Sequence, residues 1–528
     1  MKGLGLRQAN AWLHTWSGLL LGWLLYAIFA TGTVSFFRDE LSFWMKPELH
    51  ASRPDEGTAA RVLGAMADYA PGASSWQISL PDERNPSVAV QWYAQGERPS
   101  KGGGSRLVLD AATAQPLQAR DTRGGDFLYR FHFELYGMPR IAARWIVGVA
   151  TMFMLVAIVS GVITHKKIFT DFFTFRRRKG QRSWMDAHNA LAVLALPFHL
   201  MITYSGLLLL MFMLMPWGVQ SAYQGDLRAY FAERGGRGAA QVAAPQAQGR
   251  AAPAPQAPVG PMLAQARAAW PAGAGGISVM QPGTTQAVVE LREGGSTSLL
   301  DRGRAQRMRF DGVTGVRLPM PAEPAPDGVS MVYNVFSSLH LLRFAGPWLR
   351  WLFFASGLLG TAMVATGLVL WVVKRLPQRR KQGGHAGHRL VECLNAATVA
   401  GLPVAMGAYF WANRLLPVGM AGRADWEITS FFAAWAACLA HALLRSHRQA
   451  WREQLAAVAV LFAGLPLFSF LAYPHSHLAA GSWLLAGVDA TLLALGALAA
   501  AGAWTLRTPV AARPARQREH AAANEVAA

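Results

Sequence analysis

The fold is decided by an early apolar segment, residues 16–37, whose sequence is WSGLLLGWLLYAIFATGTVSFF. The segment has no charged residue and reaches the length of roughly 20 residues needed to cross a hydrocarbon core about 30 Å thick. Seven further stretches have the same character: 143–165, 187–215, 347–373, 390–413, 427–444, 454–473 and 482–505. We therefore predict an integral membrane α-helical bundle of about eight spans.

The composition agrees with this class. Hydrophobic residues make up 52% of the chain and charged residues 15%, whereas roughly 25% are charged in ordinary soluble domains. The formal net charge of +20 would favour a nucleic-acid partner in a soluble chain, but here the basic residues flank the apolar stretches. The only cysteines, Cys393 and Cys438, exclude a disulfide framework, a Cys-ligated iron–sulfur cluster and a structural zinc site.

Lys and Arg follow spans two, four, six and eight, and this asymmetry orients the chain. The basic segments are Lys166–Arg182, Lys374–Arg389, Arg445–Arg452 and Arg507–Arg518. We expect both termini in the cytoplasm and the two long loops on the opposite side. A cleaved signal peptide is the competing interpretation, because Lys2 and Arg7 precede the first apolar run. No clear small-x-small cleavage site follows that run.

The loops 38–140 and 216–339 are too long and too polar to be simple connections. Each mixes a helical stretch, such as Ala59–Tyr69, with short alternating strands, such as Ser87–Tyr93. We predict two small α+β domains, the second opening with a flexible spacer at about Gly235–Pro261. The expected division is 1–37 first span, 38–140 first domain, 141–215 spans two and three with a basic loop, 216–339 second domain with its spacer, 340–375 span four, 389–506 four additional spans and 507–528 cytoplasmic tail.

An internal repeat relates the two halves of the first 375 residues. Four histidines each precede a Ser/Thr–Gly pair: His14 before Thr31-Gly32, His188 before Ser205-Gly206, His132 before Ser160-Gly161 and His340 before Thr366-Gly367. The first two spacings to glycine are both 18 positions. The repeated unit consists of one span, one α+β domain and a second span. Duplicated halves of this kind commonly enclose a shared site between them. We interpret the small-residue pairs as points of close helix approach. Asp110 and Asp311 end matching strands, where we expect them to hold turns rather than iron.

The chain resembles the PepSY-associated transmembrane helix proteins, which include bacterial inner-membrane siderophore reductases. The resemblance rests on His14-Thr15-Trp16-Ser17-Gly18, on Phe37-Arg38-Asp39-Glu40, on the Asp-x-x-Thr strand ends and on the paired histidines. It covers about residues 10–375 and leaves the last four spans outside. It implies two PepSY-like periplasmic domains, a bacterial inner membrane and a ferric siderophore as electron acceptor.

Histidines within spans are costly and mark candidate functional sites. His188 and His199 lie 11 positions apart, so on a straight helix they share one face at a separation of about 16 Å. Imidazoles at two depths would suit two haem b groups stacked across the bilayer, each with two axial histidines.

Six histidines are candidates for the four axial positions, so the pairing stays open. Inner candidates besides His188 are His165 and His14, and outer candidates besides His199 are His340 and His132. We favour His165 with His188, and His199 with His340 or His132. The repeat instead pairs His14 with His188 and His132 with His340, and it places Leu25 and Trp371 where His199 and His165 would have counterparts.

Several other polar or aromatic clusters have plainer interpretations. We assign two closely spaced histidine pairs, His385/His388 and His475/His477, to loops rather than to metal sites. A tryptophan-rich edge reads as an aromatic belt at the membrane surface. Its members are Trp12, Trp16, Trp145, Trp348 and Trp351.

These features favour an oxidoreductase that passes single electrons across the membrane. The cytoplasmic loops are too short for a nicotinamide or flavin domain, so electrons would come from a quinol or a separate flavoprotein. Siderophore oxygens are hard ligands that hold Fe(III) better than Fe(II), so reduction would aid iron release. Two other functions stay open. One is a cofactor-free, membrane-anchored binding or regulatory module. The other is a permease that uses the last four spans, where Asp489 is the main intramembrane charge and His441 lies near an edge.

Overall fold

The fold was determined as a computed structural model. It describes residues 5–97, 103–165, 168–176, 179–227, 229–230, 252–295, 298–300, 302, 305–320, 328–383, 385–478 and 483–507. Most of the predicted spacer and of the C-terminal tail therefore lies outside the described residues.

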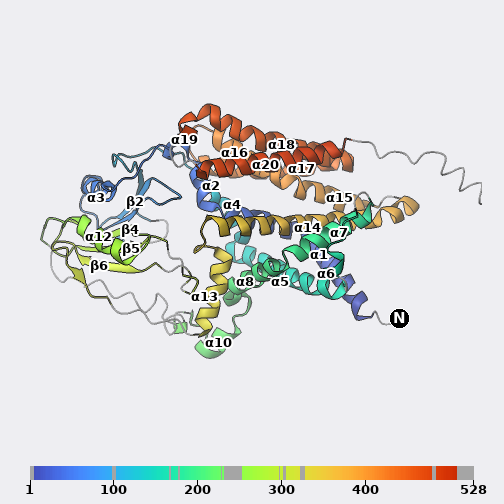
Figure 1. Cartoon of the computed structure of the whole chain (residues 1–528), viewed down its shortest axis with the longest axis horizontal. Helices are drawn as coiled ribbons and strands as arrows, with labels where there is room; N and C mark the ends of the chain where they lie inside the picture. Colours follow the sequence, from blue (N-terminus) through green and yellow to red (C-terminus); the bar gives the residue numbers. More distant parts are fainter. Residues whose placement is uncertain are drawn as a thin grey trace, which may run out of the picture.

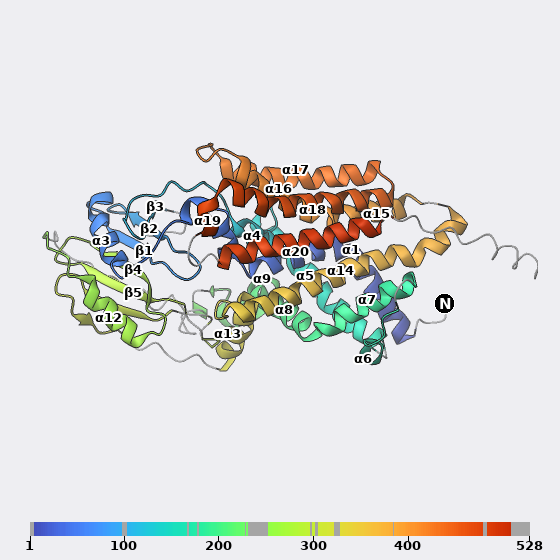
Figure 2. The same cartoon turned by 45° about the horizontal axis from the view of Figure 1, so that its top comes forward.

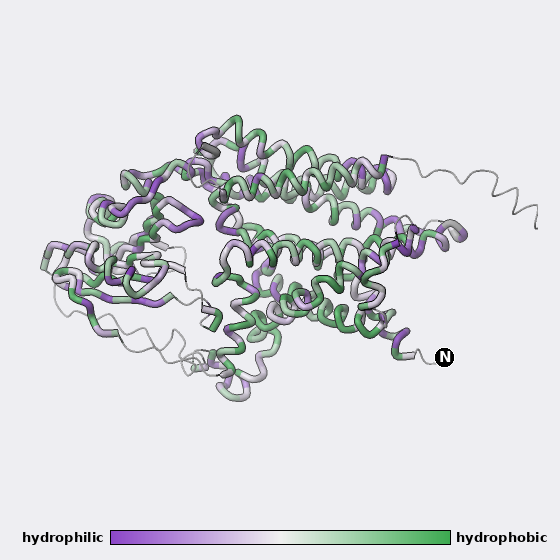
Figure 3. Tube along the Cα trace, viewed as in Figure 1, coloured by the Kyte–Doolittle hydropathy of each residue, from purple (hydrophilic) through white to green (hydrophobic). Residues whose placement is uncertain are grey.

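Apolar helices confirm a multi-pass membrane protein. Among the described residues seven helical segments are long and apolar enough to cross a bilayer, and the bent pair of α7 and α8 would make eight if it forms one span. The seven are α1 (Leu6–Ser35), α5 (Arg140–Thr164), α14 (Pro347–Gln382), α15 (Ala386–Val399) continued by α16 (Gly401–Leu415), α17 (Arg423–Leu444), α18 (His447–Ala472) and α20 (Trp483–Thr505). Figure 3 shows apolar residues along these helices and polar residues at their ends.

The first part of the chain forms one helical bundle centred on α1. Helix α1 packs against α5, α14 and the short helix α4 (Gly125–Glu134), while α7 (Gln181–Leu194) packs on α14. Helix α8 (Leu196–Leu209) packs on α5 and on α13 (Gly328–Leu341). Helices α4 and α13 lie at the same end of the bundle, the end that carries the sheet domain (Figure 1).

The last spans form a second bundle beside the first, and Figure 2 shows α15 to α20 side by side. Helix α2 (Arg38–Trp44) docks on α20. Trp44 donates from Nε1 to Asp489 at 2.9 Å, and Arg414 donates to the Trp44 carbonyl oxygen at 2.9 Å. A shared apolar core that includes Trp44, Phe127 and Phe431 joins the two parts.

The two long loops build one domain around one sheet, which corrects the prediction of two separate α+β domains. Its seven antiparallel strands have the order β3-β2-β1-β4-β5-β6-β7. The strands are β1 (Ser75–Ser79), β2 (Val88–Tyr93), β3 (Ser105–Leu109), β4 (Ala274–Met280), β5 (Val288–Glu293), β6 (Arg307–Asp311) and β7 (Arg317–Leu318). Helices α3 (Thr58–Tyr69) and α12 (Val259–Ala269) share one apolar core with the sheet.

The junction of the two halves explains this fusion. Strand β1 pairs with β4, with Trp76 opposite Val279 and Ile78 opposite Ile277. A three-stranded sheet from one loop would leave β1 as an exposed edge, and pairing with β4 satisfies its backbone groups. The repeat therefore extends into the sheet domain as a symmetric pair of halves joined at their edges.

Candidate functional site

Four of the six candidate histidines form two ring pairs, one toward each end of the first bundle. In the inner pair, His14 on α1 lies beside His188 on α7, with ring centres 6.2 Å apart. In the outer pair, His132 on α4 lies beside His340 on α13, also with ring centres 6.2 Å apart. Each pair takes one histidine from each half of the repeat, so the site is shared between the halves.

Each of these imidazoles is held through its Nδ1 atom. Three of the Nδ1–H groups donate to main-chain carbonyl oxygens: His14 to Ala157 at 2.9 Å, His132 to Ile28 at 2.7 Å and His188 to Met363 at 2.9 Å. The fourth, that of His340, donates to the hydroxyl oxygen of Ser205 at 2.9 Å. A carbonyl oxygen can only accept, so at least three rings carry their proton on Nδ1 and present a lone pair at Nε2. Within the described residues none of the four Nε2 atoms forms a hydrogen bond. Metal-binding histidines have this arrangement of one anchored and one free nitrogen.

A glycine lies against each of the four rings. An added Cβ at Gly32 would come within 2.6 Å of His132, and one at Gly161 within 3.2 Å of His14. The same measure gives 3.1 Å between Gly367 and His188 and 3.2 Å between Gly206 and His340. The Ser/Thr–Gly pairs that the sequence places in close helix contacts thus make room for the histidines. A His–Gly contact joins α1 to α5, α1 to α4, α7 to α14 and α8 to α13.

The residues of each pair can be compared with the needs of a haem iron. Proteins hold haem iron through histidine side chains, and each pair brings two imidazole rings to a separation of 6.2 Å. The donor set of two neutral imidazoles with anchored Nδ1 atoms therefore fits a bis-histidine haem. Among the described residues no group of three or more His, Cys, Asp or Glu could hold another metal ion.

The structure does not bring His165 into either pair. Its Nε2 atom accepts a hydrogen bond from the Asn189 side-chain amide at 2.8 Å. The favoured pairing of His165 with His188 therefore finds no support in the geometry, and the pairing given by the repeat is the one observed.

His199 also stands apart from the two pairs, because α7 and α8 are not one straight helix. The two helices meet at an angle of 67° near Ala195, where Pro197 lacks the N–H that a continuous helix would need. The prediction that His188 and His199 share one straight face is therefore wrong. His199 is buried and packs edge-on against Phe29, and its Nε2 atom has no hydrogen-bond partner in the part of the chain that the structure describes.

The inner pair has an aromatic and basic rim. The Arg375 guanidinium lies 3.9 Å from the centre of the Trp371 ring and 6.0 Å from that of Trp16. Trp371 also contacts His388, which in turn lies beside His385. Because Arg375 and the basic residues that follow it sit at the end of α14 remote from the sheet, this rim marks the end expected to be cytoplasmic.

Other sequence candidates have structural roles. Asp110 and Asp311 each accept backbone N–H bonds from the residues two and three positions on, which confirms their assignment to turns. Asp489 is bonded to Trp44, and His441 to Glu453 at 2.8 Å. Arg423 and Glu427, both fully buried, form an ion pair that also binds Asn413. Asp489 and His441, the two ionisable groups noted in the last four spans, thus each have a side-chain partner.

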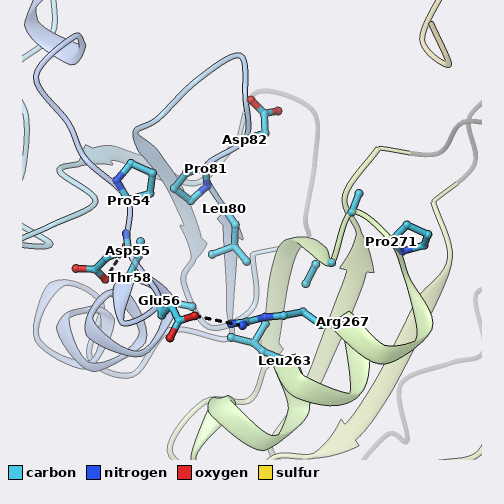
Figure 4. Close-up of a pocket in the computed structure, with 14 residues that line it drawn as sticks. Pro54, Asp55, Glu56, Thr58, Leu80, Pro81, Asp82, Leu263, Arg267 and Pro271 are labelled. Atoms are coloured by element: carbon cyan, nitrogen blue, oxygen red, sulfur yellow. Dashed lines mark hydrogen bonds and ion pairs between the residues drawn. The ribbon is translucent and has the colours of Figure 1, made fainter. Parts of the chain in front are cut away.

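A cavity of about 410 Å³ lies in the sheet domain between α3 and α12. Figure 4 shows Glu56 and Arg267 facing each other across it, with a separation of 3.9 Å. Asp55 and Asp82 also line it, so its rim is acidic. Hydrogen bonds from Arg61 and Gly57 lower the pKa of Asp55. It lies on the helix-covered side of the sheet and contains none of the paired histidines.

The fold, with its duplicated span–domain–span unit and shared histidine pairs, defines a class of membrane protein built from two parallel halves. Residues 11–374 match the PepSY-associated TM region, and the chain therefore belongs to the PepSY-associated TM family. No curated protein matches the chain. The match ends before α15, so the last four spans are an addition to the family's region.

Proposed function

We propose that this protein binds two haem b groups, one between His14 and His188 and the other between His132 and His340, and carries electrons to a ferric chelate. The observation that supports the proposal best is the pair of 6.2 Å ring separations, each with anchored Nδ1 atoms. When bound, each haem would be held by the two histidines of its pair and would supply one-electron redox chemistry.

The chain's own residues have two tasks in this proposal. The Nδ1 bonds to main-chain oxygens hold each imidazole in one tautomer and orientation. Gly32, Gly161, Gly206 and Gly367 leave space beside the rings. Phe29, Met154 and Met363 belong to one buried apolar cluster in the bundle, and Phe29 packs against His199.

The direction of transfer follows from the charge distribution along the bundle. The basic end of α14 favours a cytoplasmic location for the inner pair, so the sheet domain would lie in the periplasm of a bacterial inner membrane. Electrons would enter from a quinol or a separate flavoprotein near the Trp16–Trp371 rim and leave beneath the sheet. One electron converts one Fe(III) chelate to Fe(II), which hard oxygen ligands hold less tightly.

The proposal is tested with the purified, detergent-solubilised full chain. We expect a reduced-minus-oxidised visible spectrum of b type and two haems per chain by pyridine haemochrome. Prereduced protein should be reoxidised by an added ferric chelate, with Fe(II) appearing in a colorimetric trap at one equivalent per electron lost. Protein made with ample haem that contains none would refute the proposal and favour a cofactor-free binding module.

A further inference from the structure

The sheet has one face that neither α3 nor α12 covers. Directly opposed residues in an antiparallel sheet lie on the same face, and the register places Trp76, Ile78 and Val279 on the side of the two helices. The other side, which we call the roof face, carries the residues that alternate with these. On strands β2, β1, β4, β5 and β6 its polar members include Ser75, Gln77, Ser79, Gln91, Ser278, Glu290, Arg292, Arg307, Arg309 and Asp311, and Arg106 lies opposite Gln91 on β3.

The roof face is turned toward the membrane helices. Figure 1 shows α3 and α12 on the side of the sheet domain that is remote from the helical bundle. Val108, on the roof face, packs on the core that contains Trp44. The β5–β6 loop reaches α13, where Ser338 donates to the Leu299 carbonyl oxygen at 2.9 Å. This contact lies two residues from His340, so the β5–β6 loop reaches the end of the bundle that holds the outer histidine pair.

Arginine dominates the charge of this face. It carries four arginines and two acidic residues, and Asp311 is already engaged in its turn. Glu290 pairs with Arg307 at 3.2 Å and with Arg309 at 2.8 Å. Arg106 and Arg292 are exposed, and neither has an ion-pair partner among the described residues.

One pairing on the roof face works against the stability of the sheet. Arg292 on β5 lies directly opposite Arg307 on β6, and like charges in that position are destabilising. The neighbouring pair, Glu290 opposite Arg309, is of the favourable kind. An anion bound between the two guanidinium groups would remove this repulsion, because guanidinium recognises carboxylate oxygens in a two-pronged geometry.

We propose that the roof face receives an anionic ferric chelate, one whose carboxylate or catecholate oxygens carry net negative charge, and holds it between Arg292 and Arg307, which lie directly opposite each other. The inference rests on the proposed function and names its substrate class. The two sides of the sheet domain differ in charge, because the cavity on the opposite, helix-covered side is lined by the acidic residues Asp55, Glu56 and Asp82. A cationic chelate would be repelled at the roof face.

The test measures binding of redox-inert Ga(III) complexes to the full-length solubilised protein by calorimetry. The probes are gallium citrate as the anionic chelate, a neutral gallium trihydroxamate and a gallium trihydroxamate with a free ammonium group. At about 0.05 M salt we expect the anionic complex to bind about tenfold more tightly than the cationic one. The difference should fall to within about twofold at about 1 M salt, where the Debye length is about 3 Å.

Variants locate the binding. Arg292→Glu with Arg307→Glu should weaken gallium citrate binding at least about tenfold and leave the neutral complex within about twofold. Arg292→Gln, which removes a charge without reversing it, should give a smaller loss in the same direction, so that a misfolded double variant would not end the test. Arg267→Glu on α12 is the matched control, and it should leave binding of the anionic complex unchanged.

The outcomes separate this inference from the proposed function. Gallium binding needs no haem, so haem-free protein that still prefers the anionic complex would support the roof face while refuting the reductase. Protein that contains two haems and reduces iron, but binds the three complexes equally or prefers the cationic one, would overturn the roof face and leave the reductase intact.

Discussion

The contact between Gly32 and His132 gives the sharpest structural prediction. A methyl group at position 32 would lie 2.6 Å from both Cε1 and Nδ1 of His132, whereas nonbonded carbon atoms prefer about 3.5–4.0 Å. The ring must therefore move by about 1 Å in Gly32→Ala. Such a shift breaks the 2.7 Å bond from Nδ1 to the Ile28 carbonyl oxygen, and overpacking of this kind costs about 1–3 kcal/mol.

A displacement of this size exceeds the tolerance of a cofactor site, which is about 0.5 Å. We expect Gly32→Ala to lose the outer haem, giving one haem per chain by haemochrome, or to retain it with an altered visible spectrum. Gly161→Ala and Gly367→Ala, with contacts of 3.2 and 3.1 Å, should have milder effects on the inner haem. Gly18→Ala is the matched control in α1, because nothing lies within 4 Å of its added Cβ. Two haems with an unchanged spectrum in Gly32→Ala would refute the packing argument.

Three further predictions concern buried polar groups. His199→Leu should keep both haems and leave the melting temperature unchanged or slightly raised. It removes a buried Nε2 atom that has no hydrogen-bond partner among the described residues and introduces leucine, the residue found at the matching position of the other half, Leu25. Loss of a haem in this variant would show that His199 is a ligand. Glu427→Gln leaves the fully buried Arg423 without its partner and should destabilise the solubilised protein by about 3–5 kcal/mol, whereas Glu453→Gln, at a pair 31% exposed on both sides, should cost at most about 1 kcal/mol. Burial lowers the pKa of His50 from its usual 6.5 to about 4, so the folded state favours the neutral imidazole. The contribution of His50 to stability is complete above pH 6.5 and is lost as the pH falls toward 4, and thermal melts should show a loss of about 2 kcal/mol at pH 5 that is absent in His50→Gln. Equal pH dependence of the two melting curves would contradict this prediction.

The sequence was sufficient for the spans and for the repeat. Apolar length alone marks the helices, and the equal spacings from His14 to Gly32 and from His188 to Gly206 already relate the two halves. The repeat also contained the correct ring pairs. The expectation that His188 and His199 share one face assumes a straight helix, and Pro197 interrupts the helix between these two histidines.

Three features needed the three-dimensional structure. His132 and His340 lie on short helices before their spans, so hydropathy could not show that these helices enter the bundle. The glycines looked like helix contacts because sequence cannot say whether the neighbour is a backbone or an imidazole ring. The single sheet depends on the β1–β4 pairing, which joins segments almost 200 positions apart and leaves no local sequence signal.

The central claim is that two histidine pairs, and not the other two histidines, hold two haems. The most direct measurement is the haem count per chain in six single variants, each purified in the same detergent. We expect one haem per chain in the four variants of the paired histidines, His14→Ala, His188→Ala, His132→Ala and His340→Ala. We expect two haems per chain in His165→Ala and His199→Ala. A full count of two in any of the first four, or a loss in either of the last two, would contradict it.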